Sequence, residues 1–269
     1  GVQTCALPIW NQIREQYTSV DGGDCASRKR FWMNHQRFFR ILITEMKVRE
    51  AIQIAEREQR KGHSVVIAMQ MTGESSKRRG ESDAGLREII RSACPVGWSP
   101  PGLEHMEFPP NPLDQIVAHF GPGQVAEISG RTHRHDPTAT EGAMRVSNAD
   151  ECHAFCAGTK TLAVITRSGS SGISLHDANE CCQRKRVQIF LELPWDAPTF
   201  VQQCGRVHRT KQLSTPDIIC LCSEVPSEIR FMHALFQKVG DLSSITRGDR
   251  SFIPNISTPY GEDIEDAVS

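Results

Sequence analysis

Residues 64–70 read SVVIAMQ, five apolar residues in a row with a polar residue at each end. A strand that is buried on both faces of a parallel sheet has such a continuous run, whereas a half-exposed strand alternates apolar and polar residues. Gly62 and His63 precede the run and are suited to a turn. The run therefore predicts an interior strand of a parallel sheet.

Three further runs of the same kind follow along the chain, at 161–166 (TLAVIT), 187–193 (VQIFLEL) and 217–223 (DIICLCS). Helical patterns lie between and after them, at 149–157, 198–207 and 226–239. Alternating strands and helices predict an α/β fold, with a mostly parallel sheet flanked by helices. Ligands of such sheets bind beyond the carboxyl ends of the strands, so the loops after Thr166, Leu193 and Ser223 are the first candidates for a site.

The segments around these runs have a different composition. Residues 28–61 predict a long helix or two short ones, with ten Lys or Arg against four Glu, a balance of 10 − 4 = +6. That charge fits either a solvated helix face or a contact with a phosphate backbone. Residues 72–148 are rich in Gly, Pro, Ser and charge, and we expect an insertion with short helices, one at 113–120, rather than core sheet.

The two ends of the chain are expected to lie outside the main domain. The first nine residues, GVQTCALPI, resemble the translation of a sequencing-library adapter, so we expect 1–9 to be unpacked and an upstream coding region to exist. Residues 10–27 are then a leader and 28–252 the domain. Residues 253–269 contain four acidic residues and no basic one, which indicates an acidic tail or linker.

Overall composition excludes several classes of protein. With 31 Lys and Arg against 32 Asp and Glu, the chain of 269 residues cannot bind nucleic acid by net charge alone. No run approaches the roughly 18 apolar residues of a membrane span, and no signal peptide is visible, so we expect an intracellular protein with no membrane partner.

The ten cysteines lack paired C-x-x-C motifs, which favours reduced thiols. Cys152, His153 and Cys156 lack a fourth ligand at a recognisable spacing, so no metal site is predicted.

The loop after the second predicted strand reads TRSGSSGISL, at 166–175. Glycines let backbone N–H groups approach an oxyanion, and the serine hydroxyls add donors. The same sequence also fits a flexible connection without a ligand.

Four residues fill the pattern Q-x-x-G-R-x-x-R, which is motif VI of superfamily 2 helicases: Gln202, Gly205, Arg206 and Arg209. The loop 166–175 is similar to motif V of these helicases, and residues 64–70 occupy the place of motif IV. This order of motifs resembles the second RecA-like lobe of a helicase.

The resemblance narrows to the helicase C-terminal domain of the strawberry notch family. It covers most of 31–250, through the blocks FWMNHQRFFR, HSVVIAMQMTGE, NPLDQI, VAEISGR, SSGISLHDA, RVQIFLELPW, FVQQCGRVHRTKQ and ITRGDR. The stretch 131–145 is short for the family, and Cys204 and Cys222 stand where other core residues are expected, which puts details of the substrate in doubt.

The resemblance implies roles for individual residues. Residues three apart on a helix share a face, so Arg206 and Arg209 are expected to reach one ligand, as arginine fingers for the γ-phosphate of ATP. The alternative is a surface helix with salt bridges. The family implies ATP contacts for Gln202, Gly205 and Gly172. Nucleic-acid contacts are implied for four residues of the motif V loop: Thr166, Arg167, Ser170 and Ser171. Residues 169–172 of this loop are expected to lie beside the motif VI helix, at one edge of the sheet.

No phosphate-binding loop of the form G-x-x-x-x-G-K-[ST] occurs in the sequence. We therefore expect ATP and Mg²⁺ to be bound mainly by a first RecA-like lobe upstream in the same protein, and the present chain to be inactive alone. The resemblance implies a nuclear protein that regulates transcription through chromatin or nucleic acid, with transcription regulators as partners. The alternative is a helicase-shaped coregulator that binds proteins without hydrolysing ATP.

Overall fold

The computed structural model describes residues 2–19, 25–70, 84–95, 97–131, 147–167, 169, 172–177, 182–209 and 212–247. The chain forms two compact units, one comprising 1–46 and 73–112 and the other 47–72 and 113–269. The second unit contains the sheet and all the residues of the candidate site.

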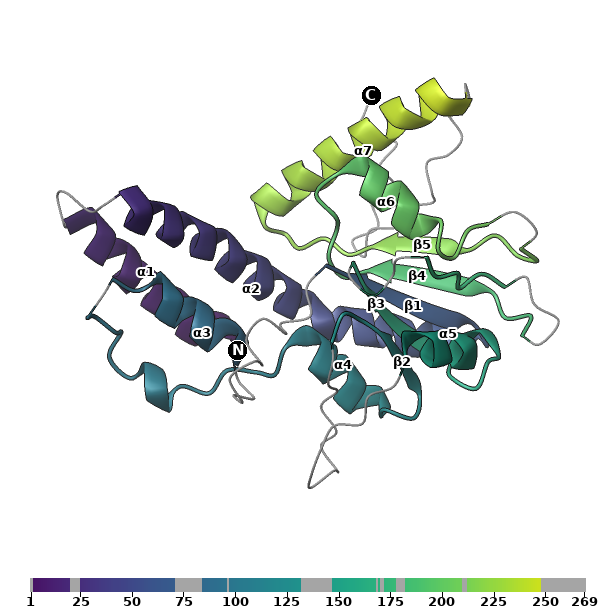
Figure 1. The fold of residues 1–269 in the computed structure, drawn as a ribbon, viewed down its shortest axis with the longest axis horizontal. Helices are drawn as coiled ribbons and strands as arrows, with labels where there is room; N and C mark the ends of the chain where they lie inside the picture. The colour runs from purple at the N-terminus through teal and green to yellow at the C-terminus, as the bar shows by residue number, and fades with distance from the viewer. Residues whose placement is uncertain are drawn as a thin grey trace. The chain divides into compact units, whose positions relative to one another are not determined.

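Five parallel strands form the sheet of the second unit (Figure 1). They are β1 (Ser64–Met69), β2 (Val125–Ile128), β3 (Leu162–Thr166), β4 (Arg186–Phe190) and β5 (Asp217–Cys220). Their spatial order is β2-β3-β1-β4-β5, which puts β1 at the centre. Met69 pairs with Thr166, and Ala68 pairs with Phe190, so the strands end together at one edge of the sheet.

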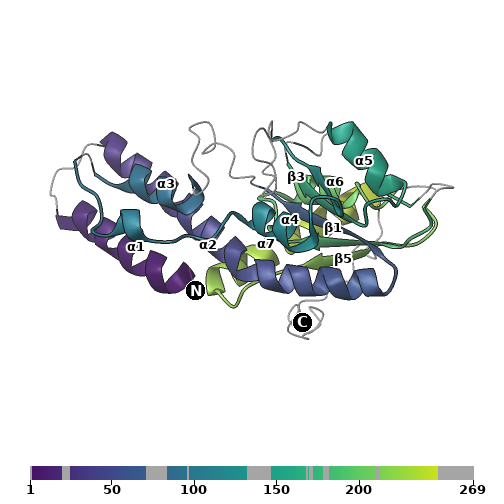
Figure 2. The same cartoon turned by 90° about the horizontal axis from the view of Figure 1, so that it is seen from below.

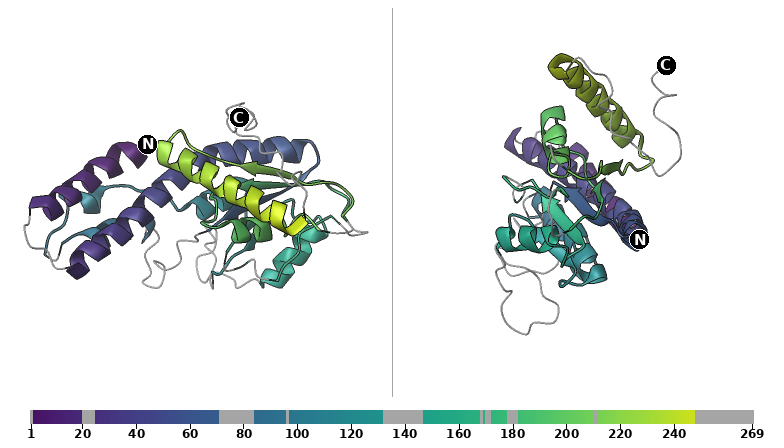
Figure 3. Two further views of the ribbon diagram at one scale, coloured as in Figure 1. Left: turned by 90° about the horizontal axis from the view of Figure 1, so that it is seen from above. Right: turned by 90° about the vertical axis from the view of Figure 1, so that its right-hand side faces the viewer.

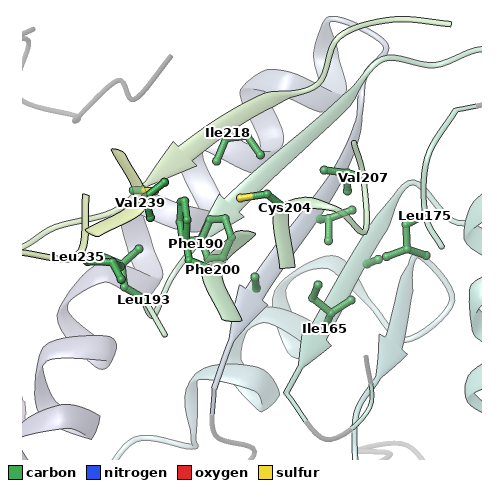
Figure 4. Close-up of a cluster of buried hydrophobic side chains, with 14 of the residues drawn as sticks. Ile165, Leu175, Phe190, Leu193, Phe200, Cys204, Val207, Ile218, Leu235 and Val239 are labelled. Atoms are coloured by element: carbon green, nitrogen blue, oxygen red, sulfur yellow. The ribbon is translucent and has the colours of Figure 1, made fainter. Parts of the chain in front are cut away.

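Helices cover both faces of this sheet. On one face, the residues of α2 (Cys25–Arg60) from Val48 onward pack with α4 (Pro112–Phe120) in a single apolar cluster. Figure 2 shows this part of α2 running along the sheet. On the other face lie α5 (Asn148–Cys156), α6 (Ala197–Cys204) and α7 (Pro226–Arg247). In Figure 3, α7 is the long yellow-green helix. Side chains of both α6 and α7 reach the core of this face, where Phe200 packs on Phe190 with ring centroids 4.8 Å apart (Figure 4).

The predicted α/β fold with a parallel sheet is confirmed, and all four predicted strands are present within a few residues of their expected bounds. The prediction of an insertion without core sheet across 72–148 was wrong. β2 lies inside it and forms an edge strand beside β3, with Val125 paired to Leu162. The segment VAEI has only four residues, and Glu127 interrupts its apolar residues. It therefore does not form a recognisable apolar run.

The first unit is helical. It contains α1 (Val2–Ser19), the first part of α2, α3 (Ala84–Ala93) and the short 3-10 helix η2 (Leu103–His105). Its apolar core includes Trp10, which stacks on Phe38 with ring centroids 4.3 Å apart. The single domain expected for 28–252 is therefore divided, because residues up to Met46 and from Gly73 to Pro112 belong to this unit.

The expectation that residues 1–9 are unpacked was wrong where side chains are described. Ile9 is buried in the core of the first unit, and Leu7 packs against that core. The residues expected to form a leader, 10–27, contribute Trp10 and Ile13 to the same core. The origin of the first nine residues stays a prediction, and residues 253–269 lie outside the described part of the chain. Within the described residues, no helix is both long and apolar enough to cross a membrane.

Candidate functional site

A hydrogen-bond network of glutamine and glutamate residues, all buried except the half-buried Gln70, lies towards the carboxyl edge of the sheet. The backbone N–H of Gln70, which follows β1, donates to Glu192 Oε2 at 2.7 Å. The side-chain amide of Gln70 donates to Gln203 Oε1 at 3.1 Å. Gln188 on β4 donates to the carbonyl of Gln203 at 3.3 Å. This network fixes α6 against the ends of β1 and β4.

The loop after β3 lies close against the end of β2. A Cβ on Gly169 would lie 2.4 Å from the carbonyl oxygen of Ile128, so only glycine fits there without movement of the backbone. Gly172 has a φ of +76°, which also favours glycine. The positions of Gly169 and Gly172 in this loop therefore both favour glycine.

Two of the residues predicted to bind nucleic acid are described, and they differ in exposure. The side chain of Thr166, the last residue of β3, is buried, whereas Arg167 is exposed. Ser170 and Ser171 lie outside the described residues. Of the described members of this group, only Arg167 presents its side chain to solvent.

The helix that leads to motif VI begins at a clear cap. Asp196 precedes α6, and its carboxylate accepts a hydrogen bond from the N–H of Thr199 at 2.8 Å. Hydrogen bonds from Thr199 lower the pKa of Asp196, because they stabilise the charged form. The helix ends at Cys204, and Gly205 is its C-cap residue. Gln202 is exposed on the last turn.

Arg206 and Arg209 lie beyond the end of α6, so the prediction that they share a helix face was wrong. Arg206 is buried, with 7% of its surface exposed, whereas Arg209 is exposed. The helix stops before either residue, and the three-residue spacing consequently does not align them. The structure gives the two arginines different environments.

Arg206 holds the segment 173–175, which follows the glycine loop, through two hydrogen bonds. Its guanidinium Nη1 donates to the carbonyl of Ile173 at 3.1 Å, and its own carbonyl accepts from the N–H of Leu175 at 2.8 Å. Burial, followed by the charge of Arg209, lowers the pKa of Arg206. Motif VI therefore contacts the end of the predicted motif V loop, at residues 173–175. Ser170 and Ser171 lie outside the described residues, so their expected position beside motif VI stays a prediction.

Arg209 stays close to the end of the helix. Its Nε donates to the carbonyl of Gly205 at 3.2 Å, and its backbone N–H donates to Gln212 Oε1 at 2.8 Å. Burial, followed by the charge of Arg209, lowers the pKa of His176. Arg209 is thus an exposed cation beside the loop that follows β3.

A buried carboxylate joins the same two loops a second time. Asp177 accepts hydrogen bonds from the backbone N–H groups of Leu213 and Ser214, both at 3.0 Å, and from the hydroxyl of Ser214 at 2.5 Å. Only 1% of Asp177 is exposed. Arg206, in motif VI, therefore bonds back to the motif V loop, and Asp177, just after that loop, bonds forward to the residues that follow motif VI.

Cys152, His153 and Cys156, the three possible metal ligands in the sequence, differ in their exposure to solvent. Cys152 and Cys156 are partly buried, whereas His153 is exposed. Across the part of the chain that the structure describes, no group of three or more His, Cys, Asp or Glu side chains is placed to hold a metal ion.

Comparison with known proteins assigns the family. A family model described as the C-terminal domain on strawberry notch homologues matches residues 111–268, which is more than half of the chain. The chain belongs to the strawberry notch family. It carries the helicase C-terminal domain of that family, in agreement with the resemblance found in the sequence.

Individual relatives match more than half of the chain. The protein strawberry notch of Drosophila melanogaster is 36% identical over 60% of the chain, and human protein strawberry notch homolog 1 is 36% identical over 54%. Protein FORGETTER 1 of Arabidopsis thaliana is 34% identical over 65% of the chain. The chain spans only 11% of the first two relatives and 14% of the third.

Several residues of this strawberry notch domain were missed in the sequence. Gln203 adjoins the motif residue Gln202 yet makes the buried contacts, and the sequence predicted no individual role for Gln70 or Asp177. Gln70 follows β1 and Asp177 follows the motif V loop, and these two positions were the available signal. Their partners lie 133 and 36 residues away in sequence, so no local pattern reveals the contacts.

Proposed function

We propose that this chain is the second RecA-like lobe of an ATP-dependent helicase or translocase, and that ATP is hydrolysed between it and a first lobe. The observation that carries this proposal is the contrast between a buried Arg206 and an exposed Arg209. Arg206 fixes the motif VI turn to the segment 173–175. Three residues later, Arg209 offers a permanently charged fork of donors to an anion.

The two arginines then have different tasks. Arg209 is the arginine finger, which stabilises negative charge on the transferred phosphoryl group and contributes on the order of 10³ to 10⁵ in rate. Arg206 is a positioning residue, because it is buried and its Nη1 donates to the carbonyl of Ile173. This division replaces the expectation that both guanidinium groups reach one ligand.

Other ATP contacts are proposed on the same side of the domain. Gln202 is exposed on the last turn of α6 and can reach a ligand with its amide. Gly172 is exposed, and a Cβ there would meet no atom within 4 Å. Gly205, the C-cap residue of α6, is proposed as a further contact from the family resemblance. ATP and Mg²⁺ are assigned mainly to the first lobe, since this chain has no phosphate-binding loop.

Nucleic acid is proposed to bind along the motif V loop through Arg167, with Ser170 and Ser171 as further donors. An exposed arginine suits a phosphate contact. The buried Thr166 is assigned to the strand rather than to a direct contact. From the family resemblance, we propose that the intact protein acts in the nucleus and regulates transcription, with transcription regulators and chromatin as partners.

Steady-state ATP hydrolysis tests the proposal. A protein that joins this chain to a first lobe of the family should hydrolyse ATP, faster with nucleic acid added, and the chain alone should not. Hydrolysis by the chain alone would contradict the two-lobe assignment. A two-lobe protein that binds ATP but does not hydrolyse it, with or without nucleic acid, would favour the non-catalytic coregulator instead.

A further inference from the structure

Three consecutive residues after the glycine loop, 173–175, are each held by a side chain from another element. The carbonyl of Ile173 accepts from Arg206. The carbonyl of Leu175 accepts from Nε of the buried Arg186 at 2.9 Å. The carbonyl between them, that of Ser174, accepts from two thiols. This segment is thus anchored at every residue, and the thiols hold its centre.

The two thiols are those of Cys152 and Cys156, one turn apart on α5. The Sγ atoms of both lie 3.5 Å from the carbonyl oxygen of Ser174. A hydrogen bond from the Cys156 thiol lowers the pKa of Cys152 to about 7, and the same contact raises the pKa of Cys156. Near neutral pH the Cys152 sulfur therefore exchanges between a thiol, which donates to the carbonyl of Ser174, and a thiolate, which accepts from the Cys156 thiol.

Both cysteines are accessible enough to react. They are only partly buried, whereas most of the other cysteines with described side chains are fully buried, among them Cys204, Cys220 and Cys222. Cysteines that are oxidised reversibly combine a low pKa with access to solvent, and a second thiol often lies beside them to form the disulfide. The pair differs in this respect from the core cysteines of the same unit.

We propose that Cys152 and Cys156 are a modification site at which a hydroperoxide oxidises the two thiols to a disulfide, and that this releases the carbonyl of Ser174. The sulfur of the Cys152 thiolate attacks one peroxide oxygen, so that an S–O bond forms and the O–O bond breaks. The leaving oxygen takes up a proton. The Cys156 sulfur then attacks the sulfenic acid, an S–S bond forms, the S–O bond breaks, and the thiol proton leaves with the hydroxide as water. With hydrogen peroxide, two thiols and one peroxide give one disulfide and two waters.

The helix geometry makes this disulfide strained and therefore reversible. Side chains four apart on a helix have Cβ atoms about 5–6 Å apart, whereas a disulfide needs roughly 3.5–4.5 Å. Cys156 is the last residue of α5 and Ala157 its C-cap residue, so the required shift falls on the end of the helix. Strained disulfides have higher reduction potentials and are the ones readily reduced again.

Oxidation removes both S–H donors from Ser174, which lies between the two residues that Arg206 contacts. The segment 173–175 should then loosen its contact with motif VI. Any consequence for ATP turnover rests on the proposed function, whereas the disulfide and the loosening do not.

Peptide mapping of the full chain tests the disulfide directly. Trypsin should release residues 146–160, which contain Cys152 and Cys156 and no other cysteine. After mild hydrogen peroxide treatment, this peptide should be lighter by two hydrogen atoms and resist iodoacetamide, and dithiothreitol should restore alkylation at both positions. Cys152→Ser and Cys156→Ser should each abolish the change, whereas Cys204→Ser should not. Alkylation of both thiols after treatment, or a link from 146–160 to the cysteines of 168–184, would overturn the site.

Amide hydrogen exchange tests the release of Ser174. In the oxidised chain, the N–H of Leu175 should exchange at least several-fold faster than in the reduced chain. The double variant Cys152→Ser/Cys156→Ser keeps two hydroxyl donors and should show no change after peroxide. A disulfide that forms without faster exchange at Leu175 would refute the coupling to motif VI.

Discussion

Arg206 Nη1 lies 3.1 Å from the carbonyl oxygen of Ile173, a residue 33 positions earlier in the chain. This hydrogen bond joins the turn after α6 to the segment after the glycine loop, and the N–H of Leu175 returns a second bond to the carbonyl of Arg206. The motif VI arginine that precedes Arg209 is therefore a part of the fold as well as of the site.

Replacing Arg206 should first affect stability. Arg206→Ala removes a charged donor from a buried contact and should lower the free energy of unfolding by about 2–3 kcal/mol. Urea unfolding of the chain measures this change. Arg184→Ala removes an exposed arginine and serves as the matched control, with an expected change within about 0.5 kcal/mol. Equal stability of the two variants would show that Arg206 does not anchor the segment.

Asp177 should make a similar contribution from the other loop. Asp177→Ala leaves the N–H groups of Leu213 and Ser214 without their carboxylate acceptor, so unfolding should become easier by about 1.5–3 kcal/mol. The exposed Glu224 provides a control of equal charge, and Glu224→Ala should be nearly neutral. The account of this loop fails if both variants unfold at the same urea concentration.

Gly169 should tolerate no side chain. Gly169→Ala would bring a Cβ within 2.5 Å of Ser129 Cα, and the backbone of β2 or of the loop must move. We expect the free energy of unfolding to fall by about 1–3 kcal/mol, as at other overpacked sites. A Cβ on Gly123 would meet no atom within 4 Å, so Gly123→Ala should leave the melting temperature unchanged. Thermal melting of both variants therefore shows whether the loss at Gly169 comes from the steric clash or from replacing any glycine by alanine.

Alkylation of Cys152 should follow its lowered pKa. A thiolate fraction with a pKa of about 7 rises roughly tenfold between pH 6 and pH 8, and the rate with iodoacetamide should rise with it. Burial raises the pKa of Cys204 to about 12, so this cysteine should stay unmodified over the same range. A rate for Cys152 that only begins to rise above pH 8 would contradict the hydrogen bond from Cys156.

The sequence predicted the sheet well because interior parallel strands have a local signature. The runs at 64–70 and 161–166 have only apolar residues between their polar ends, and β1 and β3 correspond to them closely. β2 has no such signature, since it is a four-residue edge strand that contains Glu127. The two compact units were also not predicted, because their division depends on contacts between segments far apart in the chain.

The sequence predicted which motif residues lie near the candidate site, but it did not predict how they are arranged. Motif VI identified Arg206 and Arg209, yet their spacing suggested a shared helix face. α6 ends at Cys204, and Arg206 finds its partner at Ile173. Arginine is seldom buried, so a pattern of residues gives no reason to expect this contact. The sequence likewise gave no reason to expect that the thiols of Cys152 and Cys156 both contact the carbonyl of Ser174.

The central claim is that Arg209 acts on the transferred phosphoryl group. Its most direct test is the turnover of ATP by a two-lobe protein that contains this chain with Arg209→Ala. We expect turnover to fall by about 10³-fold or more while the affinity for ATP changes much less, because the finger acts mainly on charge in the transition state. Turnover equal to that of the unchanged protein, at the same ATP affinity, would contradict the role given to Arg209.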